Sequence, residues 1–103
     1  MDLFDAALAT EKEEVFKTLL EKDGVRIEKI VSLGQISPEG FWYDQAENEW
    51  VCLLSGSARL EFSDREVCLL KGDSLFLPAR EKHRVTFTDP KTPTIWLCVF
   101  WKG

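Results

Sequence analysis

The sequence predicts an all-β protein with a sandwich or barrel architecture, and three observations support this prediction. About seven or eight short segments carry alternating or continuous apolar residues, as β-strands do. Turn-forming residues, such as Ser63-Asp64 and Asp89-Pro90, separate these segments every few positions. The 103 residues contain no linker, repeat or low-complexity stretch, which indicates a single domain.

Residues 1–24 are expected to form an N-terminal segment with a short helix. Thr10 and Glu13 have the spacing of a capping box, and the apolar residues at positions 15, 16, 19 and 20 follow helical spacing. We expect a helix over about residues 11–21, which ends at Asp23-Gly24. Residues 25–103 then form the β-domain.

The strands of that domain follow from alternation and from the turns between them. Phe41 to Ser55 forms one long strand with a kink near residues 46–48, and Gly56 ends it. Residues 58–70 alternate on both sides of a turn and predict a hairpin. The expected strands are residues 25–31, 41–55, 58–62, 66–70, 74–77, 83–88 and 94–101.

The final strand, Thr94 to Trp101, is apolar on both faces. One face can point into the barrel, whereas the other needs cover from the N-terminal helix or from a second subunit. The chain also carries four tryptophans, a large apolar content for its length. We therefore expect a homodimer.

Composition excludes several classes of function. A net charge of −5 with scattered basic residues argues against a nucleic-acid-binding surface. The longest apolar run, Ile95 to Trp101, is far shorter than the roughly 20 residues of a membrane span, so we expect no membrane contact. The acidic start of the chain lacks the basic region of a signal peptide. Three cysteines without close spacing are expected to be buried reduced thiols, which favours a cytoplasmic protein.

Polar residues lead directly into the apolar part of the longest strand. Alternation places Tyr43, Gln45 and Glu49 on one face with the apolar Val51. A carboxylate just before a buried row is a poor choice for a plain core, so either Glu49 lies at the mouth of a cavity or the alternation breaks there. His83, the only histidine, lies on one face of a second strand with Val85 and Phe87, and the two faces can converge on one interior.

The second half of the chain resembles the later of the two cupin motifs. That motif runs glycine, five residues, proline, one residue, glycine, two residues, histidine, three residues and asparagine. Gly72, Pro78 and His83 stand at the matching places, whereas Arg80 replaces the second glycine and Phe87 replaces the asparagine.

The first half resembles the earlier cupin motif, in which two histidines separated by one residue precede a glutamate and a glycine. Glu49 and Gly56 match the glutamate and glycine, and Tyr43 and Gln45 occupy the histidine positions. The resemblance covers about residues 25–101 and implies the fold of a small cupin, a jelly-roll β-barrel.

The resemblance also raises the question of a metal, since cupins with both histidines hold one divalent ion there. Gln45, Glu49 and His83 could together bind Zn, Mn, Fe or Ni, with waters completing the coordination. His83 would be the only strong nitrogen ligand of such a site. Metal binding would therefore be weak, because catalytic zinc sites usually keep three protein ligands.

Without a metal, Glu49 and His83 could act as an acid–base pair in a partly dry cavity. Tyr43 and Gln45 would then hydrogen-bond the ligand, and Arg80 is the candidate to meet an anionic group at the mouth. The same four cavity residues could instead hydrogen-bond one another as a filled core.

These alternatives lead to one favoured function and two others. The sequence favours a protein that binds a small molecule, with a divalent metal as an optional component. A small cupin enzyme (an isomerase, a lyase or a metal-dependent oxygenase) that uses Glu49 and His83 is the second hypothesis, so the sequence leaves catalysis open. A pure interaction protein, with a collapsed cavity and an exposed apolar patch, is the third.

Overall fold

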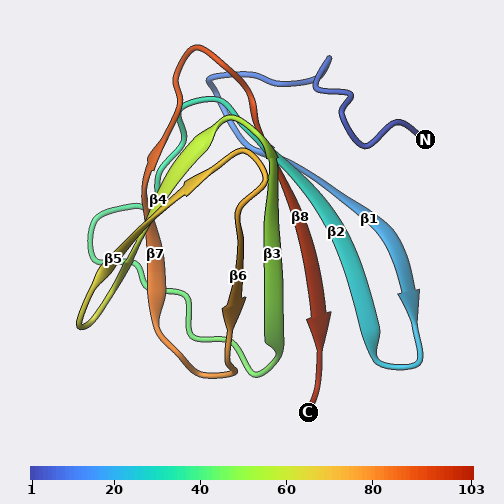
Figure 1. Cartoon of the computed structure of the whole chain (residues 1–103), viewed down its shortest axis with the longest axis vertical. Helices are drawn as coiled ribbons and strands as arrows, with labels where there is room; N and C mark the ends of the chain where they lie inside the picture. The colour runs from blue at the N-terminus through green and yellow to red at the C-terminus, as the bar shows by residue number, and fades with distance from the viewer.

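The computed structural model describes all residues 1–103 and contains eight antiparallel strands in two facing sheets (Figure 1). The wide sheet has five strands in the order β1-β2-β8-β3-β6, and the narrow sheet has three in the order β5-β4-β7. No strand ladder joins the sheets, so the expected barrel is an open sandwich. The strands are β1 (Val15–Lys22), β2 (Val25–Ser32), β3 (Asn48–Ser55), β4 (Ser57–Phe62), β5 (Glu66–Leu70), β6 (Ser74–Leu77), β7 (His83–Thr88) and β8 (Thr94–Trp101).

The predicted N-terminal helix is wrong, because the chain over that range forms β1 at the edge of the wide sheet. A β-bulge between Thr18 and Leu20 shifts the register against β2. The shift moves Leu20 to the face opposite Phe16, which produces an apolar spacing that resembles a helix. The Thr10 hydroxyl accepts a hydrogen bond from the Lys12 amide in a local turn, and Asp23-Gly24 forms the β1–β2 turn with positive φ at both residues.

The long strand predicted over residues 41–55 begins only at Asn48. The preceding residues are an irregular segment, in which Tyr43 makes a single bridge to His83 at the start of β7. The other predicted strands are confirmed within one or two residues. No helix of the chain is long and apolar enough to cross a membrane.

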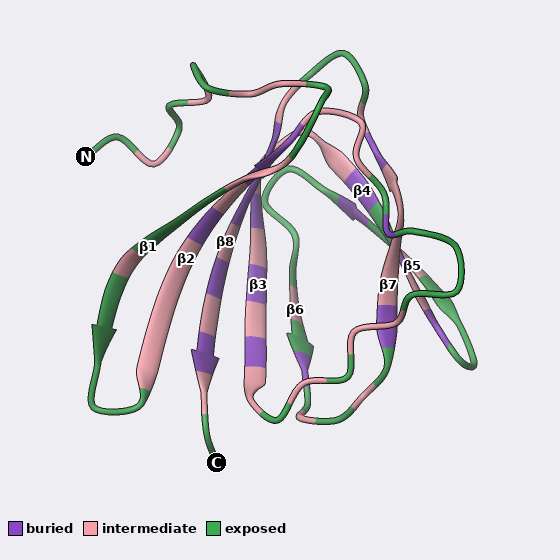
Figure 2. Cartoon of the chain, turned by 180° about the vertical axis from the view of Figure 1, so that it is seen from behind, coloured by how far each residue is buried: buried purple, intermediate pink, exposed green.

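The core lies between the sheets and draws on both. Alternate residues of β3 and β8 are buried there, whereas β1 is largely exposed (Figure 2). A bulge between Arg59 and Leu60 shifts the β4–β7 register, so Phe87 pairs with the outward-facing Arg59. Phe87 therefore lies on the outer face, and the expectation that it shares a face with His83 and Val85 is wrong. The buried cluster consists of Val51, Leu53, Ala58, Leu60, Phe62, Leu69, Leu77, Trp96, Cys98 and Phe100.

Gly56 joins β3 to β4, and two features of its position require a glycine: the backbone conformation and the close approach of Thr94. Its φ of +80° lies in the left-handed region, and a Cβ would come within 2.5 Å of the Thr94 Cα and 2.3 Å of its Oγ1. Gly72 has a similar φ of +89°, but no atom lies within 4 Å of its hypothetical Cβ.

Replacement of Gly56 by alanine should therefore destabilise the protein more than the same change at Gly72. The left-handed backbone costs alanine about 1–2 kcal/mol at either site, and the clash at Gly56 adds about 1–3 kcal/mol. Chemical denaturation of both variants measures this difference. Equal losses of unfolding free energy would show that the contact with Thr94 imposes no constraint.

Candidate functional site

A cavity of about 170 Å³ opens between the two sheets, and ten of its sixteen lining residues are hydrophobic. Tyr43, Gln45, Glu49 and His83 all line it, as the sequence predicts. Arg80 does not: its side chain is 67% exposed and pairs with Asp44 at 3.4 Å. The cavity thus has an apolar wall with a few convergent polar groups, the usual form of a small-molecule site.

Backbone hydrogen bonds hold the irregular segment with Tyr43 and Gln45 against the loop that leads into β7. The Tyr43 amide donates to the His83 carbonyl at 2.7 Å, and the His83 amide donates back at 3.2 Å. The Arg80 amide donates to the Gln45 carbonyl at 2.8 Å. Tyr43 and Gln45 therefore reach the cavity through loop pairing, and the prediction that they share a strand with Glu49 is wrong, because β3 begins at Asn48.

Arg80 adopts a φ of +69°, which is rare for a residue with a side chain. It stands where the cupin motif has a glycine, so the backbone of this loop keeps the conformation that glycine favours. The side chain extends to solvent while its amide fixes the Gln45 carbonyl.

Glu49 is the buried carboxyl group of the site, with 8% of the residue exposed. Burial raises its pKa, and the Gln45 amide and the nearby His83 oppose this only in part. Gln45 Nε2 donates to Glu49 Oε1 at 2.9 Å. The Cys98 thiol lies beside this carboxyl, and burial raises the thiol pKa well above its ordinary value. Burial of Glu49 thus favours its protonated form more than exposure to water would.

His83 is buried and has one ring nitrogen free for a ligand. Its Nδ1 lies 3.0 Å from the carbonyl oxygen of Glu81, which can only accept a hydrogen bond, so Nδ1 is the donor in this contact. Nε2 is then the ring nitrogen that makes no hydrogen bond within the protein. The ring stacks on Tyr43 with centroids 5.2 Å apart, which fixes its plane.

Sequence reasoning missed the charged residues that the wide sheet contributes to the cavity. Arg26, Glu28 and Glu14 line it beyond the part that the narrow sheet covers. Arg26 donates two hydrogen bonds to Glu47 at 2.9 and 3.0 Å and one to Glu28 at 2.9 Å. The alternation of residues 25–31 already placed Arg26 and Glu28 on one face, but it did not reveal that this face is the inner one.

The cavity is acidic, because three carboxyl groups line it and its one arginine is already paired. Glu14, Glu28 and Glu49 are the carboxyl groups, and Arg26 is occupied by Glu28 and Glu47. An anion inside would face these groups without a free arginine, so the site favours uncharged or cationic ligands.

The donor set does not fit a metal centre. No group of three or more His, Cys, Asp or Glu side chains is arranged to hold an ion. Gln45 turns its amide N–H group towards Glu49, where a ligand would need to present its oxygen to a metal.

Comparisons with known proteins identify related folds. The family model described as Cupin domain matches residues 32–100, which is more than half of the chain. No curated protein matches the sequence. A structure from Ralstonia eutropha JMP134, described as a proposed mannose-6-phosphate isomerase, is 42% identical with a TM-score of 0.94, and the match covers 100% of this chain and 97% of that one. A cupin superfamily protein from Desulfitobacterium hafniense DCB-2 is 19% identical, with a TM-score of 0.75 and coverage of 91% and 82%.

Replacement of Glu49 by glutamine should change how stability depends on pH. Because the folded pKa lies above the ordinary 4.5, the native state holds more protons, and the stability contributed by the Glu49 carboxyl falls as pH rises from 4.5 through the folded value. Glu49→Gln keeps an acceptor for Gln45 and has no charge to bury. The variant should gain stability relative to wild type above this window, as measured by urea unfolding across pH.

The exposed Glu66 on β5 offers a matched control, since Glu66→Gln removes a carboxylate that is not buried. A stability difference between Glu49→Gln and wild type that stays constant with pH would contradict the raised pKa.

Proposed function

Because this chain belongs to the cupin family, we propose that it binds a small uncharged or cationic polar molecule between its two sheets. The observation that carries the proposal is the hydrogen-bonded pair Gln45–Glu49 beside the free Nε2 of His83, set in an apolar wall. These groups offer an amide, a carboxyl group and an imidazole nitrogen to one ligand as hydrogen-bonding partners. A pure interaction protein would instead be expected to fill this space with side chains.

The size of the cavity limits the ligand. A cavity of about 170 Å³ is close to the roughly 150 Å³ that holds a benzene molecule in a protein core. A compact polyol, sugar or amine with one ring is therefore the largest ligand that fits wholly inside. A longer molecule must extend past Arg26 and Glu28 along the uncovered part of the wide sheet.

A thermal-shift panel of polyols, aldoses, primary amines, carboxylates and phosphates tests this ligand class. We expect uncharged or cationic compounds to raise the melting temperature by several degrees near saturation. Gln45→Ala should weaken binding of the active compound roughly tenfold, because one hydrogen bond to the ligand is lost.

Glu49→Gln should weaken amines more than polyols, whereas the matched change Glu66→Gln on exposed β5 should leave both unchanged. Stabilisation by phosphates or carboxylates alone would contradict the acidic character of the site.

A second candidate function is catalysis by Glu49 and His83. Its support is the raised pKa of the buried Glu49 carboxyl beside His83, together with the 42% identical structure described as a proposed mannose-6-phosphate isomerase. In an isomerisation, ionised Glu49 would remove a proton from the carbon next to the carbonyl group and return it to the former carbonyl carbon. His83 would take the proton of the neighbouring hydroxyl group and give it to the former carbonyl oxygen, so that the two oxygens exchange roles. Tyr43 and Gln45 would hydrogen-bond the oxygens that exchange the carbonyl.

Assays for aldose–ketose interconversion separate the two functions, with mannose 6-phosphate and unphosphorylated aldoses as substrates. An enzyme loses turnover in Glu49→Gln and His83→Ala while both variants stay folded. A binding protein shows no turnover in wild type.

Metal-dependent chemistry, including that of an oxygenase, requires a stronger donor set than Gln45, Glu49 and His83 provide. We therefore expect wild type to bind Zn, Mn, Fe(II) or Ni weakly. The double variant Tyr43→His/Gln45→His should gain near-stoichiometric binding of Zn or Ni, because it adds two imidazoles beside Glu49 and His83.

Calorimetric titration of untagged protein measures this gain. His83→Ala in the double-variant background is the control and should lower the affinity again. Tight metal binding by wild type that is lost in His83→Ala would overturn this expectation and place a metal in the proposed function.

A further inference from the structure

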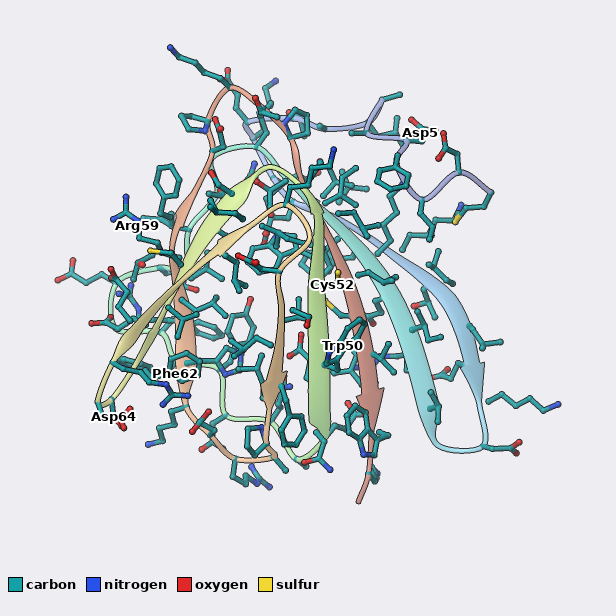
Figure 3. All side chains as sticks on the ribbon, viewed as in Figure 1. Asp5, Trp50, Cys52, Arg59, Phe62 and Asp64 are labelled. Carbon is teal, nitrogen blue, oxygen red and sulfur yellow. The ribbon has the colours of Figure 1, made fainter.

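A second cavity of about 270 Å³ lies on the outer side of the wide sheet, beneath the N-terminal segment. Its lining comprises residues of that segment together with Val15, Lys17, Lys29 and Val31. Glu28 of β2 lines the first cavity, whereas the next residue, Lys29, lines the second, so the two cavities lie on opposite faces of one sheet. Figure 3 shows Asp5 of the N-terminal segment on the opposite side of the molecule from Phe62 of the narrow sheet. The second cavity is therefore a separate site.

Lys29 brings a buried ammonium group to this cavity without an ionic partner. The residue is 7% exposed, and its Nζ donates to the main-chain carbonyl oxygens of Asp2 and Asp5. All six ion pairs of the chain are made by arginines, so no carboxylate neutralises Lys29. An ammonium group has three N–H donors, and the two carbonyls leave one of them unused. Buried charges in proteins are usually paired, so Lys29 lacks an anion.

The carboxylates of the N-terminal segment do not supply this anion. Asp2 Oδ1 accepts a hydrogen bond from the Phe4 amide, and Asp5 Oδ1 accepts one from the Ala7 amide, both at 2.9 Å. Each aspartate thus uses its side chain in a turn of its own segment and presents only its main-chain carbonyl to Lys29. The charge of Lys29 therefore remains uncompensated within the chain.

Lys17 adds a second positive charge to the same cavity. It is the cross-strand partner of Lys29 in the register of β1 and β2, and both side chains line the cavity. Like charges directly opposite each other on one face of a sheet destabilise the pairing. An anion bound between Lys17 and Lys29 would remove this repulsion and would also accept the unused donor of Lys29.

The remaining wall of the second cavity is apolar, since six of its ten lining residues are hydrophobic. Val15 and Val31 pair across β1 and β2 and form its floor. Met1 and Leu8 line it from the N-terminal segment, yet they are 72% and 77% exposed. Apolar surface is therefore left for a ligand to cover.

We propose that the second cavity binds a small monocarboxylate with a short hydrocarbon or aromatic part. The carboxylate lies between Lys29 and Lys17, and the apolar part lies on the valine pair. A single negative charge fits better than a phosphate dianion, because Asp2 and Asp5 also line the cavity. The volume of about 270 Å³ is nearly twice the roughly 150 Å³ that holds benzene, which limits the ligand to roughly ten non-hydrogen atoms.

Isothermal titration calorimetry of the untagged full chain tests the proposal with hexanoate and benzoate as probes. Both should bind at one site, and hexanol and inorganic phosphate should bind at least about tenfold more weakly. Lys29→Met keeps a long apolar side chain but removes the charge, so it should weaken carboxylate binding by about tenfold or more. Lys17→Met should weaken it by a smaller factor, because Lys17 is exposed.

Lys71→Met is the matched control, since it removes an exposed lysine from the turn between β5 and β6. It should bind carboxylates like wild type, and so should Glu49→Gln in the first cavity. Carboxylate binding that Lys29→Met abolishes thus belongs to the second cavity and leaves the proposed function of the first unaffected. Far-ultraviolet circular dichroism checks each fold, and the exposed Lys17→Met keeps the test valid if Lys29→Met unfolds.

Three results would overturn the proposal of a carboxylate site. The first is a wild type that binds neither hexanoate nor benzoate at millimolar concentrations. The second is binding that the folded Lys29→Met and Lys17→Met variants retain at full strength. The third is equal or tighter binding of hexanol or phosphate, which would show that the cavity does not recognise a single carboxylate.

Discussion

A mismatch in width between the two sheets shapes this molecule, because three strands cannot cover five. Where the sheets overlap, β3 and β8 bury alternate residues against the narrow sheet and form the core. Beyond the overlap, the inner side of β2 is uncovered and can carry Arg26 and Glu28 as the charged rim of a cavity. The outer side of the wide sheet lacks a covering sheet for a separate reason, because a sandwich of two sheets has no third layer. The charged rim of the cavity is thus the consequence of the difference in width.

The chemistry of the cavity depends on which hydrogen-bond partners its polar side chains have within the protein. Glu49 is buried, and Gln45 donates a hydrogen bond to its carboxyl group. This hydrogen bond offsets part of the free energy that burial of the charged form costs, so the pKa is raised by burial but the carboxyl group is not left without a partner. The Glu81 carbonyl and the Tyr43 ring together fix the orientation of the His83 ring, and with it the direction of Nε2. Such a set of oriented groups suits recognition of a small polar molecule.

Departures from the cupin motif have different physical meanings at different positions. Arg80 replaces a glycine and keeps its positive φ, so the loop geometry survives although the side chain changed. Tyr43 and Gln45 replace metal-binding histidines and keep their places on the cavity wall, but they change its chemistry from imidazole donors to a phenol and an amide. Phe87 replaces an asparagine and faces outward, where it stacks under the Arg59 guanidinium at 4.8 Å.

The sequence by itself determined the all-β class, six of the eight strands and the presence of Glu49 and His83 at one cavity, because alternation and turn residues are local signals. Only the tertiary structure decided the rest. Residues 15–22 became an edge strand because pairing with β2 outweighed a helical spacing that a bulge had produced. Arg26 joined the site because the narrow sheet does not cover β2, whereas Arg80 stayed outside it because its loop turns the side chain to solvent. The coverage of β2 depends on the relative widths of two sheets, which join distant parts of the chain, so no local pattern contains it.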